Sequence, residues 1–178
     1  LNAFNSETIN HFKNEGAQSL CISQELNLQE IKETLQYTDM EIEGVVYGYA
    51  TMMVTEYCPM GVLVRDCKKD KRAAKCNQSI YALKSFKGDL FRISQDIFCR
   101  STIYNSNVTC MLDNLEEIIK CGIDILRLDF TQENGQMAKD IIEAHMEVLN
   151  NNYRLGTKAT NLYNYLDSKG TTSAHYYK

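Results

Sequence analysis

The sequence lacks the features that mark linkers and membrane segments. Its 178 residues include one proline, and no Gly/Ser-rich or low-complexity stretch interrupts the chain. No run approaches the roughly 18 consecutive apolar residues that a membrane-spanning helix needs. The first residues also lack the basic, apolar pattern of a signal peptide. We therefore expect one domain without an internal linker, in a cytoplasmic protein that does not contact membranes.

An excess of positive charge is also absent. The net charge of −4 gives the chain little general attraction to phosphate backbones. One segment is a local exception, with six cations at Arg65, Lys68, Lys69, Lys71, Arg72 and Lys75. This segment indicates either a solvated basic loop or a guide for RNA or another polyanion.

What is present is a regular alternation of strand and helix patterns. The predicted strands cover residues 1–4, 18–22, 41–47 and 123–128, and the predicted helices begin near Asn5, Asn27, Asp113 and Met137. Alternation of this kind favours βαβ units on a parallel sheet with right-handed crossovers. The sequence therefore predicts an α/β fold, in which four units form half of a TIM-barrel-like domain covering residues 1–178.

A cysteine-rich, partly β insert at about residues 57–100 interrupts this alternation. Residues 59–88 show no helical periodicity, whereas residues 80–83 and 90–93 predict a hairpin around the Lys87-Gly88-Asp89 turn. Before the insert, residues 51–54 are expected to extend the third strand beyond a kink at Gly48.

Six local strings resemble peptidase family U32, in the order in which that family shows them. They are Leu1-Asn2-Ala3-Phe4-Asn5-Ser6, Ser23-Gln24-Glu25-Leu26-Asn27-Leu28, Ile42-Glu43-Gly44-Val45-Val46-Tyr47-Gly48, Tyr57-Cys58-Pro59, Ile103-Tyr104-Asn105-Ser106 and His175-Tyr176-Tyr177-Lys178. The resemblance implies a barrel-like catalytic domain of which this chain supplies the C-terminal half. Half a barrel leaves sheet edges and an inner face open. We therefore expect either a homo-oligomer or a missing N-terminal half of the same protein as the partner.

The seven cysteines suggest free thiols or metal ligands rather than disulfides. Four of them fall in the insert, at Cys58, Cys67, Cys76 and Cys99. A loop is able to bend around a metal cluster, so these thiols are candidate ligands of an iron–sulfur cluster or of zinc. Ordinary reduced cysteines are the alternative. The other three, Cys21, Cys110 and Cys121, lie in or beside apolar runs and are expected to fill the core.

The resemblance bears on this cofactor. Some U32 members carry a 4Fe-4S cluster and support oxygen-independent hydroxylation of RNA bases or of a quinone precursor. Their pattern has two cysteines separated by six residues; Cys58 matches the second, and Thr51 occupies the position of the first. Cys67 is then the candidate for the missing ligand.

Six further residues are candidates for catalysis or substrate binding. Glu25 follows a predicted strand and would lie at the rim where barrels carry their active sites; its alternative role is to favour the dipole of the next helix. Arg127 and Asp129 alternate along the last strand and are expected to share one face, as a structural pair or a substrate anchor.

The resemblance adds His175 as a catalytic residue, although Ala174 stands where the family often has glycine. Tyr47 and Asn105 are the candidate substrate-binding residues, and Gly48 predicts a bulge or a close approach to a ligand.

Three functions follow as expectations. The family name implies a collagenase-like peptidase acting on peptides, but no Gly-x-Ser-x-Gly or His-Glu-x-x-His motif supports the chemistry. The first alternative is an iron–sulfur protein for hydroxylation of RNA or a small aromatic substrate. The second is a non-catalytic assembly module.

Overall fold

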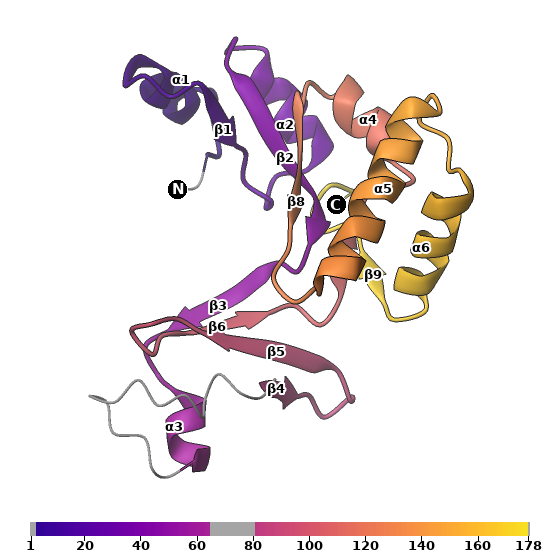
Figure 1. Ribbon diagram of the computed structural model, residues 1–178. Helices are drawn as coiled ribbons and strands as arrows, with labels where there is room; N and C mark the ends of the chain where they lie inside the picture. The colour runs from indigo at the N-terminus through magenta and orange to yellow at the C-terminus, as the bar shows by residue number, and fades with distance from the viewer. Residues whose placement is uncertain (1–2, 65–80, 178) are drawn as a thin grey trace. The chain divides into compact units, whose positions relative to one another are not determined.

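The computed structural model describes residues 3–64 and 81–177, and the chain divides into two compact units (Figure 1). The first, the α/β unit, contains Leu1–Gly48 and Asn107–Lys178, and the second, the β unit, contains Tyr49–Ser106. The β unit begins before and ends after the insert predicted at residues 57–100. Cys67, Cys76 and the basic segment at residues 65–75 lie outside the described residues.

The α/β unit alternates strands and helices as the sequence pattern predicts. Its strands are β1 (Ser19–Cys21), β2 (Glu41–Gly48), β7 (Val108–Cys110), β8 (Ile125–Asp129) and β9 (Thr171–Thr172). Its helices are α1 (Ser6–Asn14), α2 (Leu28–Leu35), α4 (Leu115–Lys120), α5 (Gly135–Asn150) and α6 (Thr157–Asp167). The predicted mixture of α-helices and parallel strands is confirmed.

Strand β2 organises the sheet of this unit. It pairs in parallel with β1, where Cys21 lies opposite Glu43, and with β8, where Val45 lies opposite Arg127. An isolated parallel bridge between Ala3 and Ile22 continues the order beyond β1. The short strand β7, which the sequence pattern did not reveal, pairs antiparallel with β2 and parallel with β9. The sheet is therefore mixed.

Helix starts follow the local capping signals closely. The Asn5 side chain accepts a hydrogen bond from the Thr8 N–H at 2.9 Å, and Asn27 forms a reciprocal capping box with Glu30. The prediction that Asp113 caps helix α4 is wrong. The N-cap position belongs to Asn114, without a side-chain cap bond, and the Asp113 carboxylate instead accepts a hydrogen bond from Tyr163 Oη.

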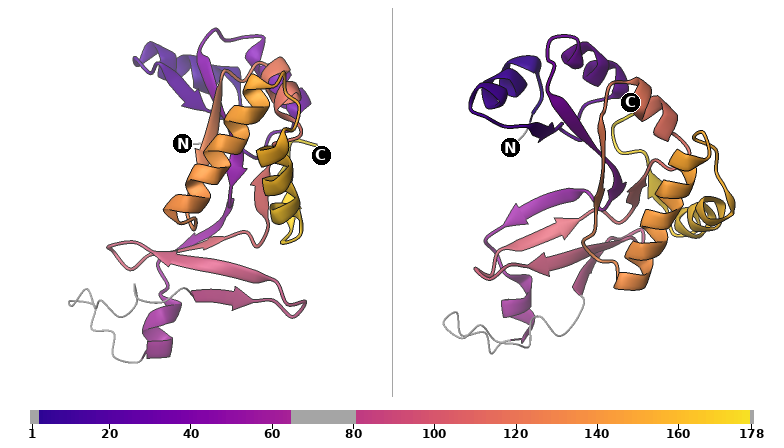
Figure 2. Two further views of the ribbon diagram at one scale, coloured as in Figure 1. Left: turned by 45° about the vertical axis from the view of Figure 1, so that its right-hand side comes forward. Right: turned by 45° about the horizontal axis from the view of Figure 1, so that its top comes forward.

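The core of the α/β unit lies between the sheet and the helices that cover one of its faces (Figure 2). Alternate residues of β2, among them Ile42 and Val46, are buried on that side together with Ile118 of α4 and Ile141 of α5. The opposite face carries the half-exposed side chains of Glu43, Arg127 and Asp129 beside the buried Val45. The apolar stripes of the helices thus hold β2 and β8 in place while leaving the second face of the sheet open in the described part of the chain.

The β unit is a four-stranded antiparallel sheet with one short helix. Its strands are β3 (Thr51–Thr55), β4 (Tyr81–Lys84), β5 (Leu90–Gln95) and β6 (Ser101–Tyr104), in the order β3-β6-β5-β4, and its helix is α3 (Pro59–Val64). The predicted hairpin is confirmed, because Tyr81 lies opposite Ile93 and Lys84 opposite Leu90.

Two expectations about this region are wrong. Strand β3 does not extend β2 but belongs to the second sheet, because Gly48 adopts a φ of +145° and ends β2. Residues 59–64 form a helix that the sequence did not indicate, since six residues are too few to show a helical period. Within residues 3–64 and 81–177, no helix has both the length and the apolar character needed to cross a membrane.

Candidate functional site

The open face of the parallel sheet carries a cluster of polar side chains from three adjacent strands. Arg127 on β8 lies between two carboxylates: its Nε is 2.6 Å from Asp129 Oδ1, and its Nη1 is 3.5 Å from Glu43 Oε2. Ser19 on β1 donates a hydrogen bond to the other oxygen of Glu43 at 2.8 Å. Arg127 and Asp129 therefore share a face and form an ion pair, as their alternation predicted. We call Ser19, Cys21, Glu43, Arg127 and Asp129 the open-face cluster.

Cys21 belongs to this cluster and not to the core. Its side chain is half-buried on β1, opposite Glu43. Burial raises the pKa of its thiol, and the charges of Glu43 and Asp129 raise it further, while Arg127 opposes them. The prediction that Cys21 fills the core is wrong; the sequence could not reveal the long-range contact with Arg127. Cys110 and Cys121 are buried, as predicted.

The cluster has one cationic side chain and two anionic ones, so its net charge is negative. Asp129, through its hydrogen bond and its charge, raises the pKa of Arg127, so the guanidinium stays protonated. Its five N–H donors are only partly used by two carboxylates on a half-exposed surface. Such a set offers both donors and acceptors to a polar planar ligand. Sequence reasoning missed Glu43 and Ser19. The available signal for Glu43 was a carboxylate within a mostly apolar strand.

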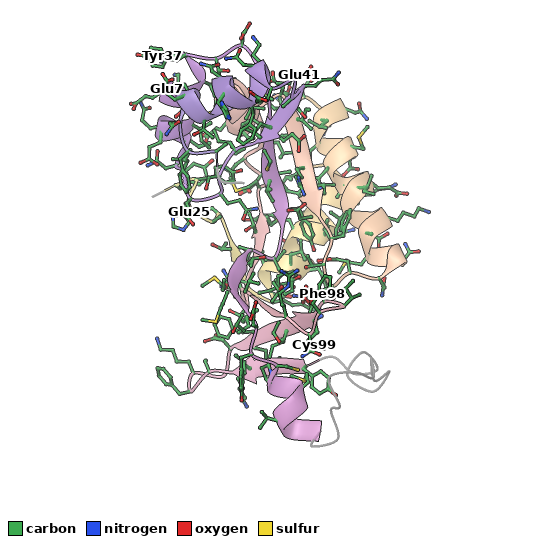
Figure 3. The ribbon with its side chains drawn as sticks, turned by 90° about the vertical axis from the view of Figure 1, so that its left-hand side faces the viewer. Glu7, Glu25, Tyr37, Glu41, Phe98 and Cys99 are labelled. Carbon is green, nitrogen blue, oxygen red and sulfur yellow. The ribbon has the colours of Figure 1, made fainter. Side chains whose placement is uncertain are left out.

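Glu25 lies in the connection between β1 and α2, where its side chain is exposed. Figure 3 shows it at the end of the parallel strands opposite to Glu41, which begins β2. Its backbone N–H donates to Ser23 Oγ at 3.3 Å, which fixes the turn. The structure thus places Glu25 at the carboxyl end of the strands, the end at which β/α folds carry their sites.

Tyr47 is directed into the helix side of the sheet. It is 1% exposed, its hydroxyl donates to Glu133 Oε1 at 2.9 Å, and its ring packs edge-on against His145. The register of β2 and β8 shifts between Val45 and Tyr47, so the bulge lies at Val46 and not at Gly48, which pairs in register with Asp129. At Gly48 itself a Cβ atom would lie 2.8 Å from the Asp129 carbonyl oxygen, so the glycine permits a close approach of two strands.

The two described cysteines of the insert lie at the same end of the β-unit sheet. The Cys58 sulfur is 2.7 Å from Gln95 Nε2 and 3.2 Å from the Gly61 N–H, both of which donate to it. Gln95 is the last residue of β5, and Cys99 lies in the turn that leads from there into β6 (Figure 3). Cys58 thus contacts the end of β5, and Cys99 lies in the turn that follows it. Within the part of the chain that the structure describes, no three His, Cys, Asp or Glu side chains come together as metal ligands.

The comparisons with known proteins agree with the sequence resemblance. The model of peptidase family U32 matches residues 1–177. The chain belongs to this family. It is also similar to the curated protein "tRNA hydroxylation protein P2" of Bacillus subtilis (strain 168), with 23% identity over 151 residues. That match covers 82% of this chain and 47% of the relative, so this U32 chain spans about half of the relative's length. No solved structure matches it.

The remaining candidates of the U32 chain fall in both units. His175 is half-buried in the α/β unit, next to Ala174 with its φ of +52° and to Tyr176, whose hydroxyl donates to the Val45 carbonyl at 3.0 Å. The terminal string is thereby fixed to β2. Asn105 lies in the β unit, where its N–H donates to the Ala50 carbonyl at 2.8 Å. The two predicted substrate-binding residues, Tyr47 and Asn105, thus belong to different units.

Proposed function

We propose that this U32 chain acts in the hydroxylation of RNA, as the part of the enzyme that carries a cysteine-bound metal cluster and one wall of the substrate site. The observation that carries the proposal is the pair of N–H donors on the Cys58 sulfur, from Gln95 and Gly61. Hydrogen bonds to sulfur are typical of thiolates that ligate iron–sulfur clusters and tune their potential. The printed name of the Bacillus subtilis relative supports RNA as the substrate class.

The donor set fits such a cluster in its chemistry. Cys58 contacts the end of β5, and Cys99 lies in the turn that follows β5. In the sequence, Cys67 and Cys76 occur between α3 and β4. Four thiols are what a 4Fe-4S cluster requires, and the same set would also suit tetrahedral zinc. When bound, an iron–sulfur cluster would supply one-electron redox chemistry.

The residues of the α/β unit have a separate task in this proposal. The open-face cluster would hold and orient the substrate, with Arg127 donating hydrogen bonds and with Glu43 and Asp129 accepting them. Glu25, at the carboxyl end of the strands, would move a proton at its carboxylate. His175 would act as a further catalytic residue near β2, to which the neighbouring Tyr176 is hydrogen-bonded.

The parallel order of β1, β2 and β8, with helices on one face, also supports half of a β/α barrel. In a closed barrel the open face would be covered by four further units, from a second copy or from another part of a longer chain. The partner would then bury the open-face cluster. Removal from water strengthens the cluster's hydrogen bonds to a substrate.

The peptidase alternative has less support in the described residues. Hydrolysis of a peptide bond needs a nucleophile activated by a base or a lowered pKa. Burial and, to a smaller extent, two neighbouring carboxylates raise the pKa of the Cys21 thiol, and His145 is enclosed in the core with its Nδ1 bound to the Ile141 carbonyl. The third function, a non-catalytic module, is distinguished from both by the experiments that follow.

The cluster is tested by purifying the protein without oxygen and measuring iron, sulfide, zinc and the visible absorption spectrum. We expect about four irons per chain, and a loss of most of them in Cys58→Ser and Cys99→Ser. Cys121→Ser is the matched control, because a serine hydroxyl is able to keep the hydrogen bond from this position to the Leu28 carbonyl. Colourless, metal-free protein would refute the proposed cluster, and a stoichiometric zinc content would replace it with a zinc site.

The reaction is tested on tRNA and ribosomal RNA from cells in which the gene is deleted. Mass spectrometry of the nucleosides should show the loss of one nucleoside that is heavier than its parent by one oxygen atom. Plasmid-borne wild type should restore it, whereas Arg127→Gln should restore about a tenth or less, since the variant leaves two carboxylates without their cation. An unchanged nucleoside profile in the deletion strain would contradict the proposal.

A further inference from the structure

Charge is divided very unevenly between the two units. The β unit, Tyr49–Ser106, has ten Lys and Arg against five Asp and Glu, a net charge of +5. The rest of the chain has nine against eighteen, a net charge of −9. The modest total of −4 therefore hides a basic unit, and a unit of this charge attracts polyanions through its own local field.

One face of the β-unit sheet concentrates described cations without any acid. Arg92 lies opposite Ala82, and Ser94 lies opposite Thr102. Because side chains alternate along a strand, the register puts eight residues on one face. They are Val54, Ala82, Lys84, Leu90, Arg92, Ser94, Thr102 and Tyr104, and we call them the basic face. A hydrogen bond of 3.1 Å from Ser94 Oγ to Tyr104 Oη confirms that the two share a side.

The opposite face of the same sheet is packed over part of its area, while Met53 and Leu83 on that face remain exposed. Ile93 and Ser101 are buried there, and Gln95 contacts Cys58. On the basic face Lys84 and Arg92 are exposed, and neither has an ion-pair partner among the described residues. In the described part of the chain, this face is therefore accessible to solvent. It presents two exposed cations, the hydroxyl groups of a serine and a threonine, and a tyrosine ring.

An exposed aromatic side chain accompanies a cation at each hairpin turn of this sheet. Phe86, between β4 and β5, is 96% exposed, and Lys87 Nζ lies 5.8 Å from its ring centroid. Phe98, between β5 and β6, is 70% exposed, with the Arg100 guanidinium 5.5 Å from its ring (Figure 3). Arg100 also pairs with Asp96, so the Phe86 turn is the less neutralised of the two. An exposed ring beside a cation is available for stacking on an unpaired base.

We propose that the basic face and the Phe86 turn bind single-stranded RNA. Lys84 and Arg92 hold phosphates, and unpaired bases stack on the rings of Tyr104 and Phe86. Sheets with exposed aromatic rings and neighbouring cations suit single strands, whose bases are free to stack, better than duplexes, whose bases are enclosed. This inference deepens the proposed function and rests on it for the choice of RNA. It assigns to the β unit the task of holding the strand.

The first test measures binding of the full chain to a fluorescein-labelled oligouridine of about 12 nucleotides by fluorescence anisotropy. Each phosphate contact on a single strand contributes about 0.7 to the slope of log K against log salt. Lys84→Gln/Arg92→Gln should therefore bind at least about tenfold more weakly at about 50 mM salt and lose about 1.4 from that slope. The control Lys32→Gln/Arg154→Gln removes the same charge from the α/β unit and should bind within about twofold of wild type. Equal weakening in both variants, or none in the first, would overturn the proposal.

The second test separates stacking from simple apolar contact. Phe86→Trp should retain binding, and Phe86→Leu, which keeps the apolar bulk but removes the ring, should lose about 1–3 kcal/mol, or roughly five- to 150-fold in affinity. Equal affinity of the Leu variant, or binding of wild type to vesicles with anionic lipid but not to RNA, would refute the stacking surface. Both tests use the protein as it is purified, with the metal that it carries, so a failed cluster leaves them valid, and failed binding leaves the cluster proposal standing.

Discussion

At the scale of single residues, the buried histidine of helix α5 makes the free energy of unfolding depend on pH. His145 is 4% exposed, and its Nδ1 is 2.7 Å from the Ile141 carbonyl, so the neutral ring donates there. Its Nε2 is buried and has no hydrogen-bond partner among the described residues. Burial lowers the pKa of His145, because the charged ring would lose its hydration. Protonation is therefore easier in the unfolded chain than in the folded one.

This imbalance predicts a loss of stability in mild acid. Above the unfolded pKa of about 6.5 neither state binds the proton and the fold keeps its full stability. As the pH falls below about 6.5 the unfolded state binds the proton first, so the free energy of unfolding decreases until the lower folded pKa is passed. Urea unfolding at pH 8 to about pH 5 should show this decrease in wild type and a smaller one in His145→Phe. Identical pH dependence of the two proteins would contradict it.

At the scale of elements, the start of helix α6 depends on a side chain from the preceding helix. Its N-cap residue, Gly156, has no side chain to offer. The carboxylate of Glu147, near the end of α5, instead accepts a hydrogen bond from the Ala159 N–H at 2.8 Å. A Cβ atom on Gly156 would lie 2.3 Å from Glu147 Cδ, so the glycine makes room for this contact. The two residues act as one capping device.

A double-mutant cycle tests this device. Glu147→Ala should lower the free energy of unfolding by about 1 kcal/mol, as loss of a cap usually does. Gly156→Ser should also destabilise wild type, because its side chain meets the carboxylate, but it should stabilise the Glu147→Ala protein by supplying a new cap. Urea unfolding of the four proteins measures the cycle. Additive effects of the two substitutions would show that the residues do not act together.

The difference between local caps and caps from distant residues explains which helices the sequence predicts. Helices α1 and α2 carry their own caps, Asn5 and Asn27, within the local sequence, and both were predicted. Helix α6 was not, because its cap comes from Glu147, which lies 12 positions before the N–H that it caps. In the candidate site, the pairing of Arg127 with Asp129 follows from strand alternation. Its contact with Glu43 depends on which strands become neighbours, and alternation does not encode that.

At the scale of the whole molecule, the open face of the α/β unit and the charge of the β unit suit partners of different kinds. Ile125, on the same side of β8 as Arg127, is 38% exposed although it lies in a parallel strand. Parallel strands are normally covered on both faces. The β unit, by contrast, exposes cations and aromatic rings that suit a polyanion. In the proposals made above, the open face of the α/β unit meets the substrate and the covering units, and the β unit holds the RNA strand.

Covering of the open face by a second copy predicts self-association of the purified chain. Size-exclusion chromatography with light scattering should give a mass above 20.4 kDa that rises with concentration. Ile125→Glu places a charge in the face that would be buried, next to the acidic side of the open-face cluster, and should shift the chain to the monomer. Lys32→Glu, a charge change on an exposed helix position, should leave the association as it is. If wild type is monomeric at every concentration, a second copy does not cover this face.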